Sequence, residues 1–400
     1  MKKFFIVAAG LMLAICANAQ TKPSRAVYQD YKFTTVKANP ITSVKDQNRS
    51  GTCWVFSTIG FVESEVIRIN KIKDESKYPD FSEMFVVSKS YQARADRYLR
   101  MDGHINFAAG SECEDVLHVI RDFGLVPNKD MVGLNYGTDK PVHGELDAAA
   151  KAYVDVMLKN PNKTLSPAWK KGFEGIMDAY LGTCPESFTV DGKSYTPASY
   201  RDALKFNPDD YVSLTSFTHH PFYTWVNLEI CDNWRGDVFY NIPIDEMMAV
   251  IDNAIDKGYT LAWGADVSDY GFARDGIAAF VDQDNSSTSG SDQERWVGKD
   301  DSSKAEASSD NIVEKNPTQE SRQLDFDNKT MTDDHGMQIY GIAKDQYGKK
   351  YYMVKNSWGL TGRFYGIWYV TEPYVKGQTL SILVHKDALT ADVKAKLGIK

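Results

Sequence analysis

The sequence predicts an α+β protein in which a helical lobe precedes a strand-rich lobe. Two patterns support this class: helical periodicity prevails over residues 41–207, and strand-like runs prevail over residues 208–400. The 400-residue chain is 42% hydrophobic, so it can bury a substantial core. We interpret the helices expected over residues 127–207 as an insertion into the helical lobe.

The first elements follow from local patterns. An extended arm is expected over residues 20–40. After Cys53, apolar residues recur at three- and four-residue steps with charged residues between them, which predicts an amphipathic helix. Two more helices are expected at residues 144–159 and 166–180.

The strand-rich lobe begins with the runs 211–216 and 261–267, which are separated by a predicted helix at residues 244–257 that ends at Gly258. Residues 283–323 are different. They are rich in Ser, Asp, Glu, Lys and Asn and contain few large apolar side chains. This composition predicts an exposed, mobile loop.

A hairpin is predicted beyond this loop. Residues 337–343 and 351–355 read as strands, and the seven residues between them are polar and turn-rich. An antiparallel hairpin folded at the centre of this turn places His335 and Asn356 roughly opposite each other.

Four side chains form a candidate catalytic set. Cys53 stands at a helix start, where free N–H groups and the helix dipole favour a thiolate. His335 is the candidate base, and Asn356 can orient its ring. Gln47, together with the backbone N–H of Cys53, can donate to an oxyanion. This pattern points to a thiol acyl-transfer enzyme, in which Trp358 is expected to shield the Asn–His bond.

Two further pairs have open interpretations. Asp333 and Asp334 either solvate the loop end beside the histidine or bind the amino terminus of a substrate. His219 and His220 are interpreted as a simple loop pair rather than as cleft residues.

Three blocks of sequence carry a resemblance to a known family. They are Gln-Asn-Arg-Ser-Gly-Thr-Cys-Trp-Val-Phe-Ser at 47–57, Asp-Asp-His-Gly-Met at 333–337 and Lys-Asn-Ser-Trp-Gly at 355–359. These blocks resemble the active-site blocks of papain-like cysteine peptidases. More narrowly, they resemble the bleomycin hydrolase and bacterial aminopeptidase C branch.

The resemblance implies a papain-like two-lobed fold, with an antiparallel, barrel-like β lobe beside the helical lobe. It implies peptide or protein substrates and a covalent thioester intermediate. The catalytic residues that it assigns are Gln47, Cys53, His335 and Asn356.

The number of residues between the catalytic cysteine and histidine distinguishes the branches of the family. In papain and cathepsins the histidine follows the cysteine by ~130–150 residues, whereas 282 residues separate Cys53 from His335 here. The bleomycin hydrolase branch carries such insertions. The position three residues before Cys53 is Ser50, so the disulfide that papain forms there cannot form.

The C-terminal region bears on the cleavage mode. In the bleomycin hydrolase branch, a C-terminal arm enters the cleft and its carboxylate meets the free amino group of the substrate. Here a helix is expected at residues 388–396, and four residues follow it. We expect aminopeptidase activity if Lys400 reaches the site and endopeptidase activity otherwise, and we favour the second.

The N-terminus has the pattern of a secretory signal. Two lysines precede the apolar run 4–17, and a small-residue cleavage site follows at 17–19. Residues 1–19 are therefore predicted to be a signal peptide, with 20–400 as a periplasmic or secreted peptidase domain without stable membrane insertion. A lipoprotein signal at Cys16 is less favoured, because a bulky residue precedes it. Members of the branch are typically cytosolic, so export is a departure.

Composition restricts the partners. A net charge of −8 and the lack of long basic runs argue against nucleic-acid binding. No zinc-type spacing occurs, so no metal or cofactor is expected. A homo-oligomer is compatible with the sequence. Two states of Cys113, Cys184 and Cys231 remain open. Either two of them form a disulfide and the third is a free thiol, or all three are buried free thiols.

Two function classes follow. The first is an exported cysteine peptidase, acting as an aminopeptidase or an endopeptidase. The alternative is a weakly active or non-catalytic peptide-binding homologue at the cell surface, which the retention of all four catalytic residue types disfavours. Amidase or transamidase activity is a further alternative, because the same residues serve other acyl acceptors.

Overall fold

The structure is a computed structural model that describes residues 31–269, 271–273, 275–281 and 314–399. The predicted signal peptide, most of the predicted arm, residues 283–313 of the predicted loop and Lys400 lie outside the described residues.

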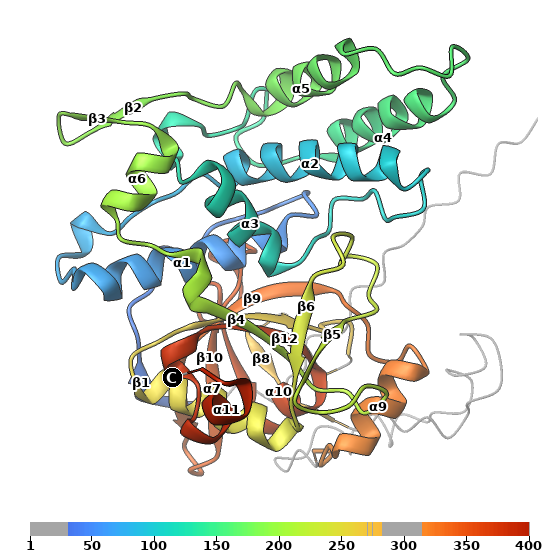
Figure 1. Ribbon diagram of the computed structural model, residues 1–400. Helices are drawn as coiled ribbons and strands as arrows, with labels where there is room; N and C mark the ends of the chain where they lie inside the picture. The colour runs from blue at the N-terminus through green and yellow to red at the C-terminus, as the bar shows by residue number, and fades with distance from the viewer. Residues whose placement is uncertain (1–30, 270, 274, 282–313, 400) are drawn as a thin grey trace, which may run out of the picture.

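Helices dominate the first half of the chain, which forms the upper part of the molecule in Figure 1. Its helices and short hairpin are α1 (Cys53–Asn70), α2 (Glu83–Arg100), α3 (Cys113–Phe123), α4 (Gly144–Leu158), α5 (Ala168–Leu181), β2 (Phe188–Val190), β3 (Lys193–Tyr195) and α6 (Pro197–Ala203). Short 3₁₀ turns occur at η2 (Glu75–Lys77), η3 (Asn128–Asp130) and η4 (Pro208–Asp210). The hydrophobic cluster that joins α1 to α5 forms the core of this part.

A ten-stranded sheet dominates the lower part (Figure 1). Its strands are β1 (Phe33–Ala38), β4 (Tyr211–Thr215), β5 (Thr224–Asn227), β6 (Val238–Asn241), β7 (Leu261–Ala265), β8 (Ile277–Ala278), β9 (His335–Asp345), β10 (Lys350–Lys355), β11 (Ile367–Thr371) and β12 (Thr379–His385). The order is β5-β6-β4-β12-β7-β9-β10-β11-β8, and β1 also pairs with β9. The accompanying helices are α7 (Ile244–Asp256), α9 (Gln319–Asp327), α10 (Glu372–Gln378), η5 (Lys386–Ala388) and α11 (Ala391–Leu397).

The sheet is mixed rather than wholly antiparallel, which corrects one detail of the predicted fold. The pairs β4–β6 and β8–β11 are parallel, and the other pairs are antiparallel. The cause at one edge is plain. β5 forms the edge of the sheet and pairs antiparallel with β6. β6 lies between β5 and β4 and runs parallel to β4.

Most predicted elements are confirmed. The helix after Cys53, the helices α4, α5 and α7, and the hairpin of β9 with β10 all form where the sequence indicates. The prediction of a loop up to residue 323 is wrong at its end, because α9 begins at Gln319. Arg322 of this helix is fully buried and donates to the backbone oxygens of Lys376, Gly377 and Thr379. Composition counts arginine as a surface residue and could not show this.

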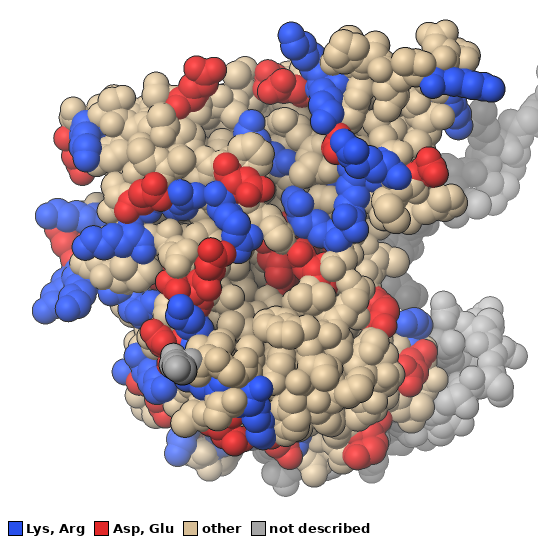
Figure 2. Space-filling model, in the orientation of Figure 1, with Lys and Arg blue, Asp and Glu red and all other residues tan. Residues whose placement is uncertain are grey.

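Helix α1 joins the two parts of the molecule. Its residues from Trp54 to Ile67 are buried, and its first turn packs against the start of β9. Gln338 of β9 donates to Ser64 of α1 with a distance of 2.8 Å. The surface is hollowed between the upper and lower parts, and acidic side chains are visible in the hollow (Figure 2).

Cys53, Cys113, Cys184 and Cys231 are free thiols, so the alternative with a disulfide among them is not realised. Within the described part of the chain, no helix combines the length and apolar character that a membrane span requires.

Candidate active site

Cys53 is the first residue of α1, as the sequence predicts for a nucleophile. The backbone N–H groups of Gly336 and Trp54 donate toward its sulfur and lower the thiol pKa. Burial has the larger effect and raises the pKa of Cys53 to about 11. In this geometry the cysteine is therefore a neutral thiol at pH 7.

His335 begins β9, and Asn356 directly follows β10. The ring Nε2 of His335 lies 2.7 Å from Oδ1 of Asn356, which also accepts from the backbone N–H of Ser357 at 2.7 Å. Because Oδ1 is an acceptor, Nε2 carries the proton and Nδ1 is the nitrogen that can take a proton from the thiol. The indole of Trp358 covers the pair, with ring centroids 4.8 Å apart.

Burial lowers the pKa of His335 to about 4, although the bond to Asn356 works in the opposite direction. Cys53 and His335 line one pocket, but no hydrogen bond joins them among the described contacts. Burial thus favours the neutral form of each partner, the thiol and the imidazole. Proton transfer must accompany the attack on a substrate.

Gln47 is positioned by the loop that carries Asn356. Its Oε1 accepts from the Ser357 hydroxyl at 2.6 Å, and its Nε2 donates to the Ser50 carbonyl at 2.9 Å. Its backbone N–H donates to the Ser357 carbonyl at 2.8 Å. The side-chain amide has a second N–H, which is the group that an oxyanion requires. Ser357, which fixes this amide, was not singled out from the sequence.

Gly336 explains how the base comes close to the helix that carries the thiol. A Cβ at this position would lie 2.7 Å from Oγ of Ser57 and 3.3 Å from Cα of Trp54. Glycine is therefore required for β9 to reach the first turn of α1. The residue lies within a recognised sequence block, but its packing role could not be read from the sequence.

The pocket beside Cys53 and His335 is acidic. Glu112, Asp232, Asp333 and Asp334 line it, and they come from three separate segments of the chain. Burial, followed by the neighbouring carboxyls, raises the pKa of Glu112 well above its usual range, and burial raises that of Asp333 to about 7. The carboxyls of these two residues are within hydrogen-bond reach of each other.

These carboxyls form no direct ion pairs with other described residues, although the buried guanidinium of Arg94 lies close enough to Asp232 to offset part of the rise in its pKa that burial causes. Within the described residues, no lysine or arginine forms an ion pair with Glu112, Asp232 or Asp333. Asp334 differs, because it accepts from the backbone N–H of Ser268 at 2.9 Å and so supports the loop. The sequence raised Asp333 as a residue that could bind an amino terminus. It contained no signal for Glu112 or Asp232.

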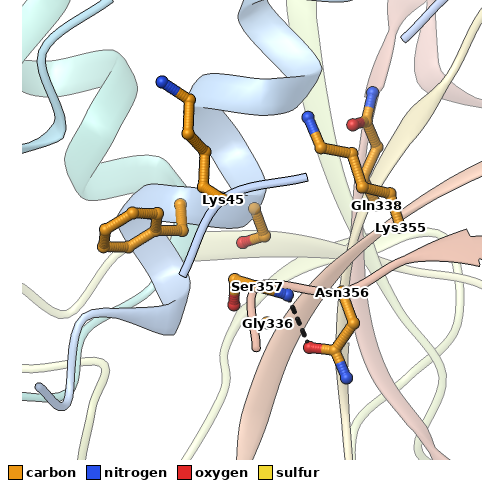
Figure 3. A pocket seen from close by; sticks show the side chains of 8 residues that line it. Lys45, Gly336, Gln338, Lys355, Asn356 and Ser357 are labelled. Atoms are coloured by element: carbon orange, nitrogen blue, oxygen red, sulfur yellow. Dashed lines mark hydrogen bonds between the residues drawn. The ribbon is translucent and has the colours of Figure 1, made fainter. Parts of the chain in front are cut away.

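A second, internal pocket lies behind Asn356. Figure 3 shows Asn356 and Ser357 on one side of it and the ammonium groups of Lys45 and Lys355 on the other. Nζ of Lys355 donates to Thr42 at 2.9 Å, and Thr42 in turn donates to the buried carboxylate of Glu63. This polar network joins α1 to β10 directly behind the catalytic asparagine candidate.

The comparisons with known proteins find cysteine peptidases and an aminopeptidase. The model of the Papain family cysteine protease family matches residues 29–95, and that of the Peptidase C1-like family matches residues 303–399. Aminopeptidase G of Lactobacillus delbrueckii subsp. lactis is 22% identical over 402 residues, which cover 90% of this chain and 84% of that protein. Mitochondrial cysteine proteinase 1 of Saccharomyces cerevisiae is 20% identical, with 95% and 82% covered.

A cysteine proteinase of Theileria parva is 32% identical over 95 residues, and the match spans only 18% of that protein and 24% of this chain. The crystal structure of PepW from Lactobacillus rhamnosis superposes with a TM-score of 0.65 at 17% identity, with 91% of this chain and 84% of that chain covered. The fold is thus papain-like.

Proposed function

We propose that this papain-like cysteine peptidase, which resembles the bleomycin hydrolase and aminopeptidase C branch, is an aminopeptidase that works through a thioester acyl-enzyme. The observation that carries the proposal is one pocket that is lined by the thiol, the imidazole and four carboxyls, and that no lysine or arginine lines. A protonated amino terminus is the substrate group that such a pocket would hold.

The residues support the following sequence of steps. As Sγ of Cys53 attacks the carbonyl carbon, Nδ1 of His335 takes the thiol proton. The oxyanion accepts from the second N–H of Gln47 and from the N–H of Cys53, which as the first helical residue has no intrahelical partner. The imidazolium then protonates the leaving amine, and a thioester remains. His335 next takes a proton from water, which attacks the thioester and releases the carboxylic acid and the thiol.

The C-terminal region supports a role for the pocket carboxyls. The Tyr240 hydroxyl donates to the Lys396 carbonyl at 2.9 Å, and the Lys396 ammonium pairs with Glu246 at 2.8 Å. The described end of the chain is thus held against β6 and α7, which contribute no residue to the pocket. We assign the recognition of the substrate's amino group to Glu112 and Asp232, which line the pocket.

The test compares a dipeptide anilide that has a free amino group with its N-acetylated form. The intact enzyme should prefer the free amino group, and Glu112→Gln should reduce this preference by about 10–100-fold, the effect of losing one charge-assisted bond. Asp237→Asn is the matched control. It alters a carboxylate in the same loop as Asp232, but one that pairs with His118 and does not line the pocket.

Two outcomes would oppose the proposal. Equal cleavage of both substrates, with internal cuts in longer peptides, would indicate an endopeptidase. A catalytically silent protein that still binds peptides would favour the peptide-binding alternative. Labelling of Cys53 by a thiol-directed epoxide distinguishes an active nucleophile from an inert one.

Export is proposed on the N-terminal pattern alone. Cell fractionation and N-terminal sequencing of the purified protein provide the test. A mature chain that begins at Gln20 in the periplasm or medium is expected. An intact N-terminus in the cytosol would contradict export.

A further inference from the structure

Outside the cleft, two histidines and a glutamate converge at one edge of the sheet. His219 and His220 lie in the loop after β4, and Glu229 lies just beyond β5, the edge strand. Nε2 of His219 is 3.0 Å from Oε2 of Glu229, and Nε2 of His220 is 2.7 Å from Oε1. The ligand atoms of the three side chains lie within 4.8 Å of one another.

The surroundings hold the His219 ring in place. Its Nδ1 lies 3.2 Å from Oε1 and 3.0 Å from Nε2 of Gln323, a residue of α9. The ring stacks on Phe326 of the same helix with an interplanar angle of 14°. Oε1 of Gln323 can therefore accept a hydrogen bond from Nδ1–H, which leaves the Nε2 lone pair directed at the convergence point. This is the outer-shell support that metal-bound histidines usually have.

We propose that His219, His220 and Glu229 bind a divalent transition-metal ion, with zinc as the best-suited metal. Two imidazole nitrogens and one carboxylate oxygen form a three-ligand set that fits tetrahedral coordination with water at the fourth position. All three side chains are partly exposed, so the ion has access from solvent. The sequence lacks a zinc-type spacing because the ligands come together only through the turn after β4 and the strand β5.

The ion would connect three segments near the cleft. Glu229 belongs to the β5–β6 connection that also carries Asp232, a pocket residue. Gln323 belongs to α9, and the chain from α9 leads directly to His335. Bound metal would therefore fix the position of the Asp232 loop relative to the segment that carries the base.

The experiment measures binding of zinc chloride by calorimetry to the full-length protein. The protein carries Cys53→Ser and Cys231→Ser, which remove the half-buried thiol of the pocket and the exposed thiol of Cys231, because thiols also bind zinc. One equivalent should bind and raise Tm. Cobalt chloride in the same background should produce visible absorption of a tetrahedral site without a thiolate band.

Variants locate the site. His219→Ala and His220→Ala should each weaken zinc binding by at least about tenfold, because each removes a ligand. Loss of only a hydrogen-bond partner of a metal ligand already lowers metal affinity by about 10–100-fold. His118→Ala is the control. His118 pairs with Asp237 at 2.8 Å but has no second imidazole beside it, so its loss should leave binding unchanged. If His219→Ala unfolds, as circular dichroism would reveal, His220→Ala decides.

Failure of the parent protein to bind zinc would overturn the proposal. Unchanged affinity in His220→Ala would do the same. Neither result bears on the proposed aminopeptidase reaction, because no step of that reaction uses these residues.

Discussion

Two buried polar clusters meet at Gly336, and they are built in opposite ways. The network behind Asn356 combines charges of both signs: Lys355 and Glu63 are joined through Thr42, and Lys45 pairs with Asp80. The pocket in front of it gathers carboxyls alone. The first cluster is balanced by its own residues, whereas no lysine or arginine lines the second.

This difference indicates which cluster supports the fold and which serves the substrate. A buried charge is costly unless it is paired, so removing one member of the balanced network should destabilise the protein. In the acidic pocket, neutralising one carboxyl removes repulsion within the protein. Its effect should therefore appear as weaker substrate recognition, while the stability of the protein stays the same or rises.

The largest effect is expected on the chemical step. Cys53→Ala should lower kcat by at least about 10⁴-fold, because the remaining groups stabilise the transition state only modestly. Tm should hardly change, since the side chain is small. Cys231→Ala, which removes an exposed thiol, is the control. Substantial residual turnover in Cys53→Ala would disprove the thiol-peptidase assignment.

A substitution in the balanced network should change the stability of the protein. Lys355→Met should lower the free energy of unfolding by about 1.5–3 kcal/mol, because it removes a hydrogen bond from a charged group to Thr42 and the attraction between Lys355 and the buried Glu63. Burial already raises the pKa of Glu63, so the loss should be larger at pH 8 than at pH 5, where Glu63 can take a proton. Urea denaturation at both pH values measures this. The more exposed Lys45 provides the comparison, and an equal loss in Lys45→Met would show that burial is not the cause.

Gln47 accepts a hydrogen bond from Ser357, which lines the pocket behind Asn356, and replacing Gln47 should affect only the rate. Gln47→Ala should reduce kcat on an amide substrate by about 10²–10³-fold if its amide donates to the oxyanion. Asn356→Ala should cost less than Cys53→Ala, because it removes positioning rather than the nucleophile. Steady-state kinetics of both variants test this. Unchanged rate constants for Gln47→Ala would refute the assignment.

The smallest effect is a pH dependence of recognition. Burial raises the pKa of Asp333 to about 7, so the pocket gains negative charge as pH rises from 5 to 7. The preference for a free amino group over an N-acetyl group should rise by at most about tenfold over this range, while the substrate amine, with a pKa near 8, remains protonated. Asp333→Asn should flatten the profile. A flat profile in the intact enzyme would remove Asp333 from recognition.

The ionisation of Asp333 should also make the stability of the folded protein depend on pH, in a direction that can be predicted. The folded protein holds a proton on Asp333 that the unfolded chain releases near pH 4, so this group makes the protein less stable as pH rises from 4 to 7. The sign is opposite to that of an ordinary salt-bridged aspartate.

The sequence predicted the parts of the molecule that depend on local patterns. Helical periodicity after Cys53 and alternation around the turn before Asn356 are local, so α1 and the β9–β10 hairpin were correctly located. The acidic pocket combines Glu112, Asp232 and Asp333 from distant segments, and no local signal brings them together. Arg322 shows the same limit, because its burial depends on carbonyl groups more than fifty residues away.

The separation of the thiol from its base between α1 and β9 has a consequence for biosynthesis. A ribosome completes Cys53 early and His335 only after 282 further residues. Until β9 has been made and has docked on α1, the nascent chain contains a cysteine whose thiol proton has no acceptor. If Cys53 and His335 act as proposed, an incomplete chain is unable to hydrolyse peptides, and proteolytic activity arises only when the interface between the two lobes is complete.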